Sequence, residues 1–128
     1  QNAGLGMDHG IAHAFGGRFG TSHGLLNAIA LPYVLEYNQQ DPQVAEDLER
    51  LSRLIDKNII AEIKDLNQSF GIPNSFQAAG IPAEQFKGHY DELLKNSLLG
   101  STQRNPVKMN AVEMDKVLTS IYYGEKKF

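Results

Sequence analysis

Apolar residues recur at intervals of three and four along nearly the whole chain, the spacing that places them on one face of an α-helix. No segment shows the alternating, β-branched pattern between turn residues that predicts a β-strand. Two runs are clearest: Val44, Leu48, Leu51 and Ile55, then Ile59, Ile60, Ile63, Leu66 and Phe70. The pattern therefore predicts an all-α fold, a helical bundle-like domain.

Local signals place the boundaries of the first three helices. The glycine pair at 16–17 predicts the end of the first helix, because glycine tolerates the left-handed conformation that closes a C-terminus. Thr21 or Ser22 is expected to cap the second helix, and Pro32 to kink it or split it in two. An aspartate followed by proline at 41–42 predicts the start of the third helix.

The second half of the chain continues the same pattern. Apolar spacing predicts a helix that begins near Ala83 and includes Phe86 and Tyr90. Residues 101–109 are expected to form an exposed loop. Asn110, with Glu113 three residues later, resembles a capping box that begins the last helix.

Length and composition limit the function classes. The chain has 128 residues, which suits one domain over 1–128, and it contains no cysteine, which excludes disulfides and thiolate metal sites. The net charge of −3, without a basic stripe, argues against binding to nucleic acid or to an anionic membrane. The longest apolar stretch, 25–35, is too short to span a membrane, and no secretory leader is visible. These features predict a cytoplasmic protein.

Histidines are concentrated near the N-terminus. Three of the four lie between His9 and His23. His9 and His13 are four residues apart, so on one helix both rings project from the same face. The glycine-rich turn at 16–20 can bring His23 back toward that helix. Clustered imidazoles suit zinc, iron, copper or nickel, so we favour a metal site over a chance grouping.

Two other candidate ligands are set aside. Asp8 points roughly 100° away from His9 around the helix and is therefore a poor co-ligand. The fourth histidine, His89, lies among polar neighbours and is expected on the solvated surface.

The histidine blocks resemble the signature of the iron-containing alcohol dehydrogenases. The similarity covers residues 6–17 (GMDHGIAHAFGG), 22–29 (SHGLLNAI) and 31–38 (LPYVLEYN). Near the other end, the asparagine–proline pair at 105–106 and the helix after it resemble the C-terminal segment of this family. One departure is Val107, where many members carry arginine.

The resemblance implies a fold and a site. The chain is expected to be the C-terminal helical domain of the dehydroquinate synthase-like fold, without its Rossmann-like partner domain. In this family an aspartate and three histidines hold Fe²⁺, or Zn²⁺ in some relatives. Two of these ligands map onto His9 and His23, and the other two have no counterpart here. His13 matches the histidine near the nicotinamide and the substrate, with a catalytic and cofactor-positioning role.

The implied activity is reversible oxidation of a small alcohol to an aldehyde or ketone, with hydride transfer to NAD or NADP. With two of four ligands and no cofactor domain, the isolated chain is expected to be an inactive fragment. Two alternatives stay open: a stand-alone helical module that binds a metal or a partner without catalysis, and a zinc-dependent relative of the glycerol dehydrogenases. Apolar faces left uncovered by missing helices predict a homo-oligomer.

Overall fold

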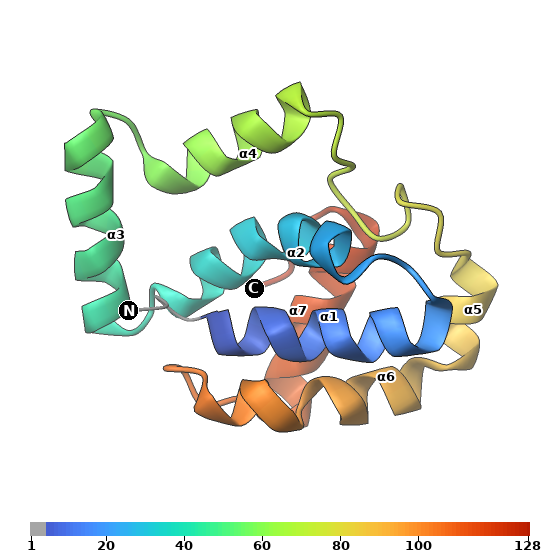
Figure 1. The fold of residues 1–128 in the computed structure, drawn as a ribbon. Helices are drawn as coiled ribbons and strands as arrows, with labels where there is room; N and C mark the ends of the chain where they lie inside the picture. The colour runs from blue at the N-terminus through green and yellow to red at the C-terminus, as the bar shows by residue number, and fades with distance from the viewer. Residues whose placement is uncertain (1–4) are drawn as a thin grey trace.

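The computed structural model describes residues 5–128, whose regular secondary structure is helical without any β-strand. This confirms the predicted all-α fold. Figure 1 shows the arrangement of the elements. In chain order they are α1 (Leu5–Phe19), α2 (His23–Asn38), α3 (Pro42–Ile55), α4 (Ile59–Ser69), α5 (Ala83–Gly88), α6 (Tyr90–Ser97), the 3-10 helix η1 (Gly100–Arg104) and α7 (Ala111–Tyr123).

The main core lies where α1, α2 and α7 meet, with α6 and η1 packed along α1 (Figure 1). Aromatic rings occupy its centre. The ring centroids of Phe15 and Phe76 are 4.7 Å apart, and Phe86 stacks on Tyr122 with centroids 3.9 Å apart. The side chains that are completely buried include Met7, Ile11, Phe15, Leu26, Phe76, Met114, Leu118, Ile121 and Tyr122. The helix that carries His9 and His13 is therefore held firmly in place.

Side-chain caps begin the helices where the sequence predicts them. The Asp41 carboxylate accepts a hydrogen bond of 3.1 Å from Val44 N, and the Asn110 side chain accepts one of 2.9 Å from Glu113 N. Of the two residues considered for α2, Ser22 is the cap. Each cap satisfies a backbone N–H that has no partner inside its own helix.

Two expected interruptions do not occur. The glycine pair at 16–17 does not end α1, which continues to Phe19 and is followed by Gly20 in the left-handed region at φ 69°. Nor does Pro32 split α2, which runs unbroken to Asn38. Proline leaves the carbonyl four residues earlier without its helical donor, and here Asn67 Nδ2 donates to that Ala28 oxygen at 2.9 Å. A hydrogen bond from α4 thus replaces the one that Pro32 removes.

Two other expectations are wrong in the second half of the chain. The helix predicted from Ala83 is divided into α5 and α6 at His89, where the backbone leaves the helical region. The expected exposed loop at 101–109 overlaps η1, and Thr102 and Asn105 of this segment are buried. Glycine allows this close packing, because a Cβ on Gly10 would lie 2.0 Å from Thr102 Oγ1.

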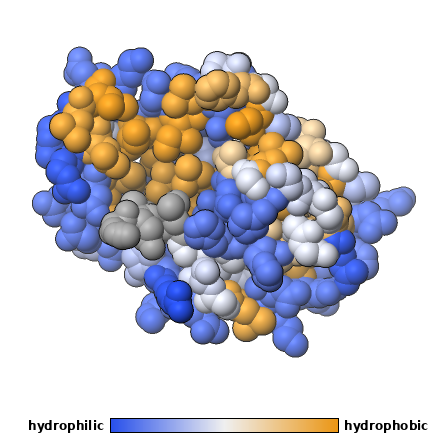
Figure 2. All heavy atoms as spheres, in the orientation of Figure 1, coloured by the Kyte–Doolittle hydropathy of each residue, from blue (hydrophilic) through white to orange (hydrophobic). Residues whose placement is uncertain are grey.

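Helices α3 and α4 stand apart from the main core (Figure 1). They share a smaller buried cluster with the end of α2, formed by Leu35, Val44, Leu48 and Ile60. Other apolar side chains on the two helices remain open to solvent, and Leu54 and Phe70 are each 76% exposed. Figure 2 shows apolar atoms gathered on this side of the molecule. Within residues 5–128, no helix has the length and apolar character needed to cross a bilayer.

Candidate metal-binding site

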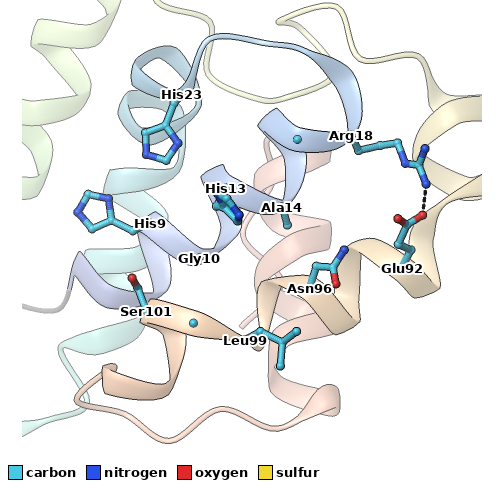
Figure 3. Close-up of a pocket in the computed structure, with 12 residues that line it drawn as sticks. His9, Gly10, His13, Ala14, Arg18, His23, Glu92, Asn96, Leu99 and Ser101 are labelled. Atoms are coloured by element: carbon cyan, nitrogen blue, oxygen red, sulfur yellow. Dashed lines mark hydrogen bonds and ion pairs between the residues drawn. The ribbon is translucent and has the colours of Figure 1, made fainter.

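The structure brings two of the predicted ligands together. The rings of His9 and His23 are parallel within 5°, and their centroids are 6.1 Å apart. His9 belongs to the second turn of α1, and His23 is the first residue of α2. Figure 3 shows how the link after α1 turns back, so that α2 begins above the first half of α1. The interruption at Gly20, rather than the pair at 16–17, allows this reversal.

The separation of the two rings is close to the one that a shared metal ion requires. Imidazole nitrogens bind zinc at 2.0–2.1 Å, so two rings on one ion have centroids at most about 6.5 Å apart. At the tetrahedral angle of a zinc site the two centroids would be about 5.2 Å apart, so the observed separation of 6.1 Å requires the rings to move about 1 Å closer. Both side chains are exposed, so their rotamers are free to adjust. Among the described residues, however, no group of three or more His, Cys, Asp or Glu side chains is close enough to hold a metal.

The two rings stand at one end of a pocket of about 970 Å³ between α1 and the α6–η1 segment. His13 lines the same pocket one turn after His9 and next to Ala14 (Figure 3), and the small residue Gly17 also lines it. At the far end, Arg18 forms an ion pair with Glu92 of α6. The pocket is therefore lined by three exposed imidazoles and, on α1, by small residues between them.

Asp8 lies outside this pocket and has an unusual environment of its own. Its side chain is buried, and its Oδ1 atom has no hydrogen-bond partner among the described residues. Burial without a compensating charge raises the pKa of Asp8 to about 8. The carboxyl group is therefore largely protonated at neutral pH and poorly suited to hold a cation. The remaining histidine, His89, is only half exposed. Its ring and that of Phe19 are arranged edge to face, with centroids 6.3 Å apart.

Sequence reasoning missed the opposite wall of the pocket. Glu92, Asn96, Leu99 and Ser101 line it from α6 and η1. These residues follow the histidines by about 70 positions or more and carry no recognisable spacing relative to them. Only the packing of α6 and η1 against α1 brings them to the site.

The amino-acid sequence also matches a known protein family. Residues 1–122 match the description "Fe-containing alcohol dehydrogenase family, C-terminal". The chain belongs to this family. The resemblance expected from the two histidine blocks is thereby confirmed.

Individual members of the iron-containing alcohol dehydrogenase family are similar over nearly the whole chain. The NADPH-dependent butanol dehydrogenase of Clostridium saccharobutylicum is 34% identical over 97% of the chain. The bifunctional aldehyde-alcohol dehydrogenase of Escherichia coli strain K12 is 29% identical over 96%. The solved iron-containing alcohol dehydrogenase of Thermococcus thioreducens superimposes on 93% of the chain with a TM-score of 0.79 and 26% identity.

The chain spans only part of each of these family members. It covers 34% of the butanol dehydrogenase, 17% of the bifunctional enzyme and 32% of the solved structure. The similarity therefore establishes a C-terminal, helical region of this oxidoreductase family.

Proposed function

We propose that the chain is the helical, metal-binding part of an enzyme that interconverts a small alcohol and an aldehyde or ketone with NAD or NADP. Membership of the iron-containing alcohol dehydrogenase family supports this proposal, as does the name of the NADPH-dependent butanol dehydrogenase. The observation that carries it is the parallel pair of His9 and His23 rings at the end of the pocket.

In this proposal His9 and His23 hold a divalent ion, Fe²⁺ or Zn²⁺. Imidazole nitrogen suits either ion, and both side chains are accessible from the pocket. Once bound, the ion supplies Lewis acidity for the reacting oxygen. The two histidines keep the ion at the mouth of the pocket, where an alcohol can approach along α1.

His13 is proposed as the catalytic and cofactor-positioning residue. It is exposed and lines the pocket one turn from His9, so it faces the space that an alcohol would occupy. Histidine side chains transfer protons readily near neutral pH. His13 would therefore carry the alcohol proton to solvent, and the family resemblance implies that its ring would also lie near the nicotinamide of a bound cofactor.

The isolated chain is proposed to be inactive. The residues from 5 to 128 offer two ligands at the site and contain no strand from which a nucleotide-binding sheet could form. Two imidazoles alone should bind metal weakly, because binding must also order the side chains. Incubation of the chain with butanol and NAD⁺ or NADP⁺ should give no reduced cofactor, and turnover at the rate of a complete dehydrogenase would contradict this.

Titration with Co²⁺, followed by its visible absorption, tests the metal centre directly. His9→Ala and His23→Ala should each weaken binding roughly tenfold or more, because each removes one of two protein ligands. His13→Ala should leave the affinity within about twofold.

His89→Ala provides a matched control, since this imidazole does not line the pocket. Equal affinity in all four variants would show that neither His9 nor His23 is a ligand. A loss in His13→Ala as large as that in His9→Ala would mean that His13 also binds the ion.

A further inference from the structure

We propose that Asn105 is a positioning residue, which sets His9 against His23 by joining the start of α1 to the end of α2. Asn105 follows η1 and belongs to the asparagine–proline pair of the family resemblance, but it does not line the pocket of the histidines. The inference rests on the proposed function only where it concerns the metal ion. The placement of the two rings is a separate, measurable property.

The Asn105 side chain has an unusually complete set of partners. Its Nδ2 donates to Asn38 Oδ1 at 2.7 Å and to the Val107 carbonyl at 2.9 Å. Its Oδ1 accepts from Asn38 Nδ2 at 3.0 Å and from Met7 N at 3.2 Å. With only 6% of Asn105 exposed, water cannot replace these hydrogen bonds without opening the structure. All the donors and acceptors of this amide are thus used within the fold.

The hydrogen bond to Met7 connects Asn105 with the helix of His9. Met7 is the third residue of α1, so its N–H is one of the donors that lack a partner within their own helix. Asn105 therefore acts as a cap supplied from 98 positions away. His9 follows Met7 by two residues, and a shift in the first turn of α1 would move its ring directly.

The paired amides connect Asn105 with the helix of His23. Asn38 is the last residue of α2 and is completely buried. The Asn38–Asn105 pair fixes the C-terminal end of α2. Because His23 is the first residue of the same helix, the pair also restrains the position of the His23 ring. A single side chain thus ties together the two helices that present the metal ligands.

Asn105→Ala tests this role because it removes all four hydrogen bonds. Tyr122→Phe is the matched control: it also deletes a buried hydrogen bond, the 2.6 Å contact from Tyr122 Oη to the Ile81 carbonyl, but on α7. Urea unfolding establishes that both variants fold and compares their losses of stability. If Asn105→Ala does not fold, Asn105→Asp replaces it, since it preserves the acceptor for Met7 N and removes the two donated bonds.

The first measurement needs no metal. Nuclear Overhauser contacts between the ring protons of His9 and His23 should disappear in the Asn105 variant and persist in Tyr122→Phe. Persistence of the contacts in the Asn105 variant would overturn the inference. Their loss in both variants would also overturn it, because any loss of stability would then suffice.

The second measurement is the Co²⁺ affinity of the same proteins. Asn105→Ala should weaken binding about 10- to 100-fold, as expected for a residue that orients a ligand. Tyr122→Phe should stay within about twofold of the unmodified chain. If the unmodified chain binds Co²⁺ independently of His9 and His23, the proposed metal centre fails, while the ring contacts still decide the role of Asn105.

Discussion

The α1–α2–α7 core and the α3–α4 pair are both helical, yet they bury their apolar side chains to very different extents. In the core, Phe15, Leu26 and Leu118 are completely inaccessible. In α3 and α4 only Val44, Leu48 and Ile60 are buried, whereas Leu54 on α3 and Phe70, directly after α4, lie largely in solvent.

The difference separates the part of the chain that buries its own apolar side chains from the part that leaves many of them exposed. The candidate site lies on α1 and α2, and most apolar side chains of these two helices are packed in the main core. The α3–α4 pair has an apolar surface of the kind that other protein elements usually cover. Placement of the histidines therefore depends mainly on the core, to which α4 adds the hydrogen bond from Asn67 to α2.

The largest effect is expected for Phe15→Ala in the core. The Phe15 ring is inaccessible and packs against Phe76 and Phe86, so its removal should cost about 3–5 kcal/mol of unfolding free energy. The exposed Leu54→Ala on α3 is the contrasting substitution and should change stability by less than about 0.5 kcal/mol. Urea unfolding measures both. Similar losses would show that the two regions do not differ as described.

Gly10→Ala should give the next largest effect, a loss of about 1–3 kcal/mol. The added methyl group would meet Thr102 Oγ1 and force η1 away from α1. Gly17→Ala on the same helix is the control, because nothing lies within 4 Å of its Cβ position. That variant should gain up to about 1 kcal/mol from helix propensity. Thermal unfolding of the two variants measures the loss of stability caused by crowding at η1. Equal changes in unfolding temperature would contradict the expected crowding.

Asp8→Leu should stabilise the core by about 1 kcal/mol at pH 7. Leucine branches at the same atom as aspartate, although its methyl groups are larger, and it removes a buried carboxyl group whose Oδ1 atom has no partner among the described residues. Chemical unfolding of the metal-free protein measures the change. A loss of stability would mean that the Asp8 carboxyl group makes a favourable interaction in the folded protein.

The smallest effect on stability is expected for Phe70→Ser, below about 0.5 kcal/mol, because this ring is already in solvent. The same change sharpens the comparison in another way, since it reduces the apolar surface of α3 and α4. Sedimentation over a range of concentrations should show weaker self-association than in the unmodified chain. A monomer at every concentration before the substitution would contradict the predicted homo-oligomer.

Local sequence signals predicted much of the fold because their physical causes are local. Asp41 and Asn110 cap the helices as expected, since a cap depends on residues only three positions away. Of the two outcomes expected at Pro32, a kink or a split, the split does not occur, because Asn67 on another helix donates to the carbonyl that proline leaves without its helical donor. The break at His89 likewise had no clear signal in the apolar spacing.

The sequence by itself determined the helical class, the capped helix starts and the two histidine blocks that identify the family, because each is encoded within a few neighbouring residues. Only the tertiary structure decided where the His23 ring lies relative to His9, which residues of α6 and η1 close the pocket, and that Asn105 joins α1 to α2. These features depend on packing between segments far apart in the chain, and helical periodicity carries no information about which faces meet.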